Sequence, residues 1–329
     1  MIPTMLFVVI LVFTINYFSE GDPVSDILGP EATQAQIDAK REELGLNDPY
    51  HEQLFRYIKG IVTEFDFGMS YKTGKNVIDE VLDRFPTTLL LTLCSMGIAV
   101  VVGITLGVIS AVKQYSVFDY IATFLSLVGV SIPSFWLGLM LMLVFAVNLG
   151  WLPASGFYGP SYWILPSVAI ATIPISTITR TTRSAMLEVI RQDYMRTARA
   201  KGLGEGAVIL RHGLKNTLIP VITVIGIQLG RTLAGSIVVE NIFSVPGLGS
   251  LIVNAIYARN YPIIQGAILF CALTFCLINL MVDILYAYID PRIKSQYVRP
   301  KARKRAPAEA AAGAGKEGRM AAKKTEEKA

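Results

Sequence analysis

Charge is scarce in this sequence, and apolar residues are in large excess. Only 17% of the 329 residues are Asp, Glu, Lys or Arg, whereas 53% are hydrophobic and the mean hydropathy is +0.50. A soluble domain needs far less apolar material to fill its core. The composition therefore excludes an ordinary soluble protein and indicates a protein that resides in a lipid bilayer.

Cysteine and histidine are also rare, which limits the chemistry that the chain can carry. Cys94, Cys271 and Cys276 lie in apolar runs, where a thiol behaves as a small hydrophobic group, so we expect no disulfide framework. His51 and His212 are far apart in polar segments, which excludes a His-rich metal cluster. We therefore expect this chain to bind neither a metal nor a cofactor.

Nucleotide-binding and catalytic motifs are missing as well. The stretch GMSYKTGK at 68–75 has five residues between its glycines, where a phosphate-binding loop has four, and Asn76 follows in place of Ser or Thr. The stretch GLGEG at 202–206 lacks a third glycine at dinucleotide-binding spacing and follows no predicted strand. We predict no catalytic residues, which indicates that the chain is not an enzyme and that any energy source lies in another protein.

Ionisable groups deep within the apolar runs reduce to Arg231 and Asp283. A proton-coupled carrier needs a relay of such groups, so a secondary carrier or channel is only a distant alternative. For Arg231, a pathway role and simple packing both remain open. For Asp283, near the end of its apolar run, we expect packing or snorkelling toward the interface.

Six apolar stretches are each about long enough to cross a hydrocarbon core, which takes roughly 20 helical residues. They occupy residues 2–18, 87–112, 118–149, 162–178, 218–237 and 263–289. We expect the third to break at SIPSF, 131–135, because Pro133 removes a backbone donor inside a helix. The predicted fold is an all-α polytopic membrane protein with six transmembrane helices and a small extracytoplasmic subdomain between helices 1 and 2.

The distribution of Lys and Arg predicts the orientation of these helices. The 180–217 connection carries eight basic residues and the tail from Arg292 carries twelve, whereas the 241–262 connection carries only Arg259. Both termini and the 180–217 loop are therefore expected to be cytoplasmic.

The same pattern predicts the domain organisation. It gives a first transmembrane helix (1–18), an extracytoplasmic subdomain (19–85), a five-helix core (86–290) and a largely disordered basic tail (291–329). No basic residue precedes the first helix, so we expect either a start upstream of Met1 or a frayed first helix.

Small residues recur at four-residue spacing in two of the apolar runs. Gly103 and Gly107 form one such stripe, and Gly226, Gly230 and Ala234 form another. Such stripes let helix backbones approach closely, so we expect them to serve helix packing.

The cytoplasmic loop contains a short predicted helix at 194–201. Met186, Val189, Ile190 and Tyr194 form an apolar stripe before it, Asp193 is placed to cap it, and Gly202 is placed to end it in the left-handed conformation. The helix would offer Ala198 and Ala200 as small contacts, with basic side chains projecting at 196, 199 and 201. Binding of anionic lipid is the simpler explanation of a basic loop. A cap, a terminating glycine and alanines favour instead a helix that inserts into a groove of another protein.

This loop resembles the EAA loop of ABC importer permeases. DYMRTARAKGL at 193–203, followed by RHGLKNTLIPV at 211–221, is similar to the form found in the dipeptide, oligopeptide and nickel branch. Arg196 and Thr197 stand where the general pattern has Glu and Ala, and only Ala198, Gly202 and Leu214 match that general pattern.

Further motifs extend the resemblance over about residues 1–298, closest to the B-type of two paired permeases. They are LGLNDP at 44, DFGMSY at 66, RFPTTLLL at 84, GVSIPSFW at 129, LPASGF at 152, RTTRSAMLEV at 180, ENIFSVPGLGSL at 240, RNYPIIQG at 259 and VDILYAYIDPR at 282.

The resemblance implies a permease that pairs with a second permease subunit, two ATPase subunits that bind ATP and Mg, and an extracytoplasmic solute-binding protein. It also implies a bacterial or archaeal cytoplasmic (inner) membrane. It implies peptide cargo, with nickel or another small solute as the alternative, and no nucleic-acid partner. The residues expected to couple to the ATPases are Asp193, Tyr194, Arg196, Thr197, Ala198, Arg199, Ala200, Lys201 and Gly202. The residues expected to line the translocation pathway are Ser131, Pro133, Ser134, Gln228 and Arg231.

Overall fold

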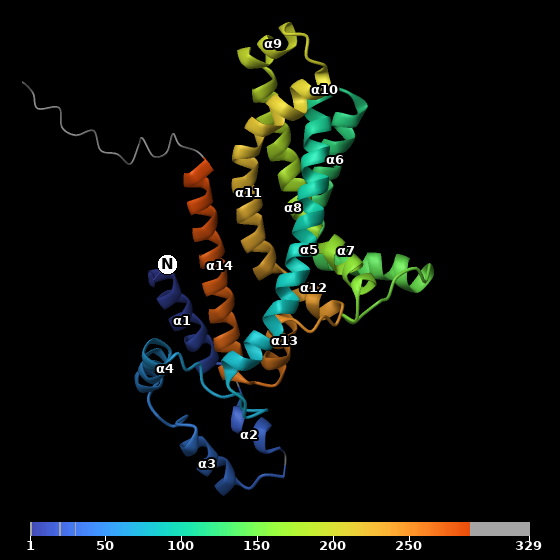
Figure 1. Cartoon of the computed structure of the whole chain (residues 1–329). Helices are drawn as coiled ribbons and strands as arrows, with labels where there is room; N and C mark the ends of the chain where they lie inside the picture. The colour runs from blue at the N-terminus through green and yellow to red at the C-terminus, as the bar shows by residue number, and fades with distance from the viewer. Residues whose placement is uncertain (1, 20, 30, 290–329) are drawn as a thin grey trace, which may run out of the picture. The chain divides into compact units, whose positions relative to one another are not determined.

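The computed structural model describes residues 2–19, 21–29 and 31–289, and this part of the chain is built from helices (Figure 1). The predicted tail at 291–329 lies outside the described residues. In chain order the helices are α1 (Ile2–Tyr17), α2 (Pro23–Leu28), α3 (Gln34–Glu43), α4 (Tyr50–Glu64), α5 (Val77–Val112), α6 (Val117–Ser131), α7 (Ser134–Leu141), the π-helix η1 (Met142–Asn148), α8 (Pro160–Ile190), α9 (Asp193–Ala200), α10 (Glu205–Ala207), the π-helix η2 (Val208–Gly213), α11 (Leu214–Gly235), α12 (Ile237–Ile242), α13 (Leu248–Tyr257) and α14 (Tyr261–Ile289).

Within the described residues, four helical segments are long and apolar enough to cross a membrane. They are α5, α8, the continuous segment Glu205–Gly235, and α14. The pair α6 and α7–η1 adds a fifth if it is counted as one broken span. Helix α1, with 16 residues, is shorter than the roughly 20 that a full crossing requires. The all-helical membrane fold is confirmed, whereas the predicted count of six spans is not.

The third apolar run breaks at Pro133, within the predicted stretch 131–135. Ile132 and Pro133 adopt extended conformations, with ψ of 122° and 133°, and α7 begins at Ser134. Proline has no N–H to continue the helical ladder, and it disfavours the helical conformation of the residue before it. The two helices that meet at this break are bent by 103° relative to each other.

The polar segment between α1 and α5 contains the three helices α2, α3 and α4. Its longest helix, α4, packs against α1: the hydroxyls of Tyr50 and Thr14 lie 2.7 Å apart, and the Phe13 ring stacks on Tyr57. A short turn after α4 is tied to the α13–α14 connection, where the Asn260 amide donates to the Ser70 hydroxyl at 2.8 Å. The segment is thus anchored both to α1 and to the start of α14.

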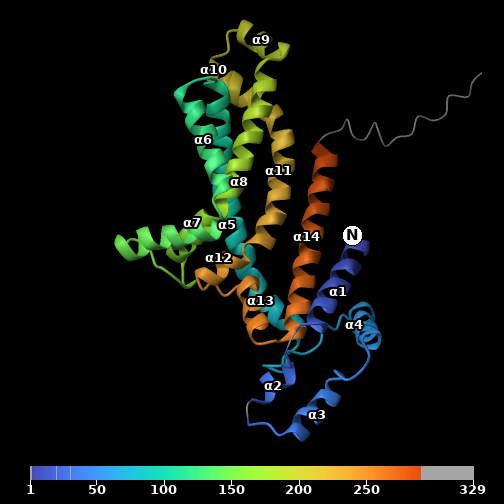
Figure 2. The same ribbon diagram turned by 180° about the vertical axis from the view of Figure 1, so that it is seen from behind.

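Close packing between helices explains both glycine stripes. A Cβ built at Gly107 would lie 2.5 Å from the Thr182 Cβ, so α5 and α8 approach to a distance that only glycine allows. A Cβ at Gly226 would lie 2.3 Å from a Val282 methyl, which brings α11 equally close to α14. Figure 2 shows α11 running between α8 and α14. Ala234 is exposed and does not contribute to this packing.

Candidate functional site

The loop that connects α8 to α11 forms a compact unit of α9, α10 and η2. In both views α9 and α10 lie at one end of the helices, beyond the ends of α5, α8 and α11 and far from α12 and α13 (Figures 1 and 2). The predicted apolar stripe that precedes α9 belongs to α8, which continues unbroken to Ile190. Only Arg191 and Gln192 separate α8 from α9, so the position of α9 depends directly on that of α8.

Two methionines anchor α9 to its own loop. Met195 is fully buried and packs with Ala198 and Val208. A Cβ built at Gly213 would lie 2.8 Å from the Met186 methyl and 3.3 Å from that of Met195, so glycine leaves room for both methionines at this point. This apolar base connects α8, α9 and η2.

The end of α9 matches the sequence prediction. Gly202 has a φ of +81°, and its N–H donates to the Arg199 carbonyl at 2.9 Å. The Lys201 N–H donates to the Thr197 carbonyl at 3.1 Å. The left-handed glycine therefore closes the last turn, as predicted.

The predicted cap at Asp193 is wrong by one residue. Gln192 takes the extended N-cap conformation, with φ −71° and ψ 149°, so Asp193 is already the first helical residue. The Asp193 side chain is 99% exposed and lies 4.0 Å from Arg196. Its carboxylate therefore adds negative charge near the positive end of the helix dipole and does not accept from the first-turn amides.

Three of the predicted coupling residues make contacts within the loop itself. The Asn216 amide donates to the Tyr194 hydroxyl at 3.1 Å, and the Arg199 Nε donates to the Glu205 Oε1 at 3.0 Å. Ala198 is buried against Met195, so the expectation that it offers a small contact at the surface is wrong.

The remaining predicted residues of α9 and its end share one exposed face. Asp193, Arg196, Thr197, Ala200 and Lys201 follow one another at helical spacings of three and four, and all five are exposed. Opposite them lie the buried Met195 and Ala198. The loop thus presents a short, net basic helical face on an apolar base.

The five predicted pathway residues fall on two elements. Ser131 and Pro133 are exposed, and Ser134 is half-buried, at the break between α6 and α7. Gln228 is buried and Arg231 is exposed on α11. Within the described residues no hydrogen bond joins the two groups, and Arg231 makes no hydrogen bond or ion pair. Asp283 is also exposed, on α14.

Two buried acids escaped the sequence analysis. Glu240 on α12 is fully buried and accepts hydrogen bonds from the Ser236 hydroxyl at 2.8 Å and the Gly249 N–H at 2.7 Å. Asp119, at the start of α6, is buried beside Arg183 of α8. Glu240 stands between Ser236 and two glycines, Gly247 and Gly249, and a Cβ at Gly247 would lie 2.4 Å from its carboxylate oxygen.

The described residues contain no group of three or more His, Cys, Asp or Glu side chains that could hold a metal ion. The exposed face of α9 offers a surface for contact with another molecule.

Two family models match the chain. Residues 103–295 match the binding-protein-dependent transport system inner membrane component, and residues 1–92 match the N-terminal part of the binding-protein-dependent transport system membrane component.

Among curated proteins, the chain is 45% identical to the dipeptide transport system permease protein DppB of Alkalihalophilus pseudofirmus, with 89% of this chain and 96% of that protein covered. It is 45% identical, with the same coverage, to the glutathione transport system permease protein GsiC of Escherichia coli. Among solved structures, a chain from the inward-facing MetNI methionine ABC transporter matches with a TM-score of 0.56 and 18% identity, covering 65% of this chain and 97% of that one. At that identity the structural match supports the fold alone.

Proposed function

The chain belongs to the family of binding-protein-dependent transport system inner membrane components, and on that premise we propose that it carries dipeptides and oligopeptides across the cytoplasmic membrane. It is a permease subunit of an ABC importer and is not itself catalytic. Dipeptides and glutathione are both short peptides, so the names of the two relatives favour peptide cargo over nickel.

In the proposed assembly the chain pairs with a second permease, two cytoplasmic ATPases and an extracytoplasmic solute-binding protein. The ATPases hold the ATP and Mg, and the 180–217 loop and both termini lie on their side of the membrane. The basic residues concentrated in that loop support this orientation, because cytoplasmic connections carry an excess of Lys and Arg.

The observation that carries the proposal is the exposed face of α9. Four exposed residues of α9, together with Lys201, lie opposite Met195, which is fully buried against the same loop. A two-turn helix held in this way suits insertion into a groove of an ATPase. When the ATPases close on ATP, α9 moves with the groove, and its apolar base transfers the movement to α8.

A face of α11 is available for the second permease or for the pathway. Gly226 and Gly230 turn toward α14, whereas Arg231 is exposed. Arg231 lies four residues before the end of α11. A charged side chain on an apolar helix is costly in lipid, so its natural surroundings are a water-filled route or a partner subunit.

The test is uptake by the complete complex in proteoliposomes, with ATPases inside and binding protein outside. Radiolabelled alanyl-alanine, glutathione and nickel serve as separate probes. We expect ATP-dependent uptake of the two peptides and none of nickel. Uptake of nickel alone would contradict the peptide assignment.

The docking face is tested by Arg196→Glu, which reverses a charge on the exposed face. We expect uptake to fall at least tenfold and less ATPase to copurify, while membrane insertion is unchanged. Arg211→Glu is the matched control, because Arg211 is exposed in the same loop but lies on η2. If Arg196→Glu imports at the wild-type rate, the docking face is wrongly assigned.

A further inference from the structure

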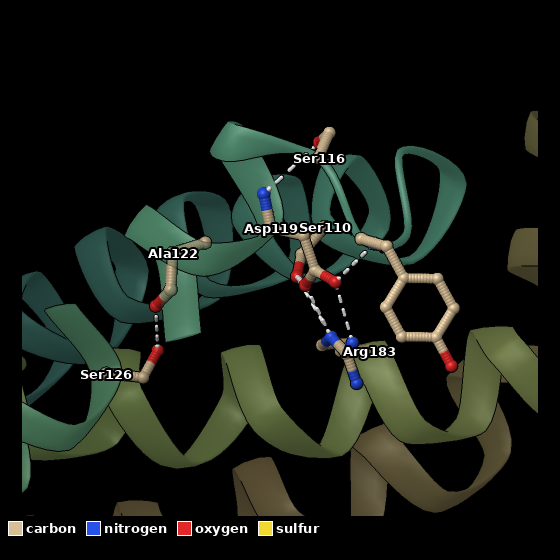
Figure 3. A network of polar contacts seen from close by, with 7 residues as sticks. Ser110, Ser116, Asp119, Ala122, Ser126 and Arg183 are labelled. Atoms are coloured by element: carbon tan, nitrogen blue, oxygen red, sulfur yellow. Dashed lines mark hydrogen bonds and ion pairs between the residues drawn. The ribbon is translucent and has the colours of Figure 1, made fainter. Parts of the chain in front are cut away.

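An ionic network with a buried carboxylate, Asp119, and a half-buried guanidinium, Arg183, joins α5, α6 and α8 (Figure 3). The Arg183 guanidinium of α8 donates from Nε and Nη2 to the two carboxylate oxygens of Asp119, at 2.7 and 2.8 Å. The Ser110 hydroxyl, near the end of α5, donates to the same carboxylate. Arg183 Nε also lies 3.1 Å from the Ser110 hydroxyl oxygen.

The carboxylate of Asp119 also holds the turn between α5 and α6. The Tyr115 N–H donates to Asp119 Oδ2 at 3.0 Å, and Tyr115 has a φ of +63°, in the left-handed region. Ser110 and Tyr115 thus already fix the position of Asp119 within the α5–α6 corner. Arg183 is the member of the network that links this corner to α8.

Stability alone is a weak explanation for such a pair. Removing the Asp119 carboxylate and part of the Arg183 side chain from water costs free energy that offsets much of their attraction, and apolar replacements of buried pairs are often neutral or stabilising. Helices α5 and α8 already pack tightly at Gly107 and Thr182 without any charge. What the bidentate pair adds is a fixed direction and distance between α8 and α6.

The network lies on the route from α9 into the spans. Arg183 precedes the end of α8 by seven residues, about 10 Å of helix. Between them, Met186 joins the apolar base of α9. Near the other end of α6, Gly129 lies against Ser176 and Thr172 of α8. Helix α6 thus contacts α8 near both of its ends. Beyond α6 the chain bends at Pro133, before α7 begins.

From this geometry we infer that Asp119 and Arg183 are positioning residues for transport. The pair makes α6 follow α8, so a displacement of α9 reaches the break before α7 instead of being lost at the α5–α6 corner. The inference rests on the proposed function, since it assigns the pair to the coupling of ATP hydrolysis to import.

The experiment compares Asp119→Asn, Arg183→Gln and the double variant in the complete complex in proteoliposomes. Uptake of alanyl-alanine and ATP hydrolysis are measured on the same preparations. We expect each variant to lower uptake about tenfold while ATP hydrolysis stays within twofold of wild type. The double variant should be no worse than either single variant, because both remove the same link. A parallel loss of uptake and hydrolysis, or no change in their ratio, overturns the inference.

Two further variants keep the inference testable if Arg183→Gln does not assemble. Arg183→Lys keeps the charge but loses the bidentate geometry, so we expect a ratio of uptake to hydrolysis between those of wild type and Asp119→Asn. Ser110→Ala keeps the ion pair and should keep the wild-type ratio. A wild-type ratio for Arg183→Lys would contradict the requirement for bidentate geometry.

Arg56→Gln is the matched control, because it breaks an Arg–Asp pair with Asp48 in the polar segment far along the chain from α9. Arg56→Gln should change neither the rate of peptide uptake nor the rate of ATP hydrolysis. If the wild-type complex itself imports no peptide, the proposed function fails; if wild type imports and Asp119→Asn remains fully coupled, only the inference fails.

Discussion

Asn216, in the first turn of α11, donates a hydrogen bond of 3.1 Å from its side-chain amide to the hydroxyl of Tyr194 in the first turn of α9. The same amide donates to the His212 carbonyl at 3.0 Å, which holds it in place. The beginning of α9 is therefore tied to a membrane-spanning helix by a polar contact, while Met195 ties the middle of α9 by an apolar one.

The apolar contact of Met195 should stabilise the loop more than the hydrogen bond of Tyr194. Met195→Ala leaves a cavity in the base of the loop and should destabilise it by about 2–5 kcal/mol, which abolishes uptake. Tyr194→Phe removes one hydrogen bond at an exposed site, worth about 1 kcal/mol, and should lower uptake less than threefold. Limited proteolysis of the loop and peptide uptake measure both effects. Equal losses in the two variants would contradict the role of Met195 as the anchor.

The cost of replacing Gly202 should depend only on how readily the new residue adopts the left-handed backbone conformation. No atom lies within 4 Å of a Cβ built there, so any cost comes from its φ of +81°. Gly202→Val should cost about 1–2 kcal/mol and distort the end of α9, whereas Gly202→Asn should be milder because Asn accepts the left-handed conformation. Peptide uptake should accordingly fall further with Gly202→Val than with Gly202→Asn. Loss of uptake with Asn as severe as with Val would point to a steric contact with the partner.

Two glycines of α5 offer a matched pair for the packing of α5 against α8. Gly107→Ala places a methyl 2.5 Å from the Thr182 Cβ and 2.7 Å from the Thr179 carbonyl oxygen, and should cost about 1–3 kcal/mol. Gly97→Ala meets nothing within 4 Å and should be neutral or stabilising by up to about 1 kcal/mol, through higher helix propensity. Thermal unfolding in detergent measures both. A Gly107→Ala protein as stable as wild type would show that the helices separate easily.

Glu240 should be needed for its hydrogen bonds rather than for its size. Glu240→Leu leaves the Ser236 hydroxyl and the Gly249 N–H without their acceptor, at a cost of about 1–3 kcal/mol for each buried group. Glu240→Gln keeps the shape and one acceptor oxygen, and should lose about half as much. The melting temperature of the purified complex distinguishes them. If Glu240→Leu melted at the same temperature as Glu240→Gln, the site would require only a side chain of this volume.

The features that the sequence predicted correctly depend on local signals. Pro133 interrupts a helix wherever it stands, and Gly202 ends α9 because a glycine after a helical pattern readily takes positive φ. The cap at Asp193 was misplaced because Gln192 adopted the extended conformation one residue earlier, and both residues suit a helix start.

The features that it missed depend on distant partners or lie outside the predicted apolar runs. Asp119 meets Arg183 across 64 residues, and Leu248 donates to Thr88 across 160. A single acid such as Asp119 within the apolar run 118–149 barely changes the average hydropathy of the run, so it did not stand out before the helices were assembled. Glu240 has near partners, Ser236 and Gly249, and was missed because it lies outside the predicted apolar runs.

The ion pair between Arg199 and Glu205 spans the turn at Gly202, and its side chains are 37% and 60% exposed. Dissolved salt screens such a pair, because the Debye length shrinks to about 8 Å at physiological ionic strength. The burial of Met186 and Met195 is strengthened by salt instead, since strongly excluded salts favour apolar burial. A rise in ionic strength around the loop should therefore loosen the turn after α9 while α9 itself keeps its position, so osmotic stress that concentrates salts should leave α9 in place.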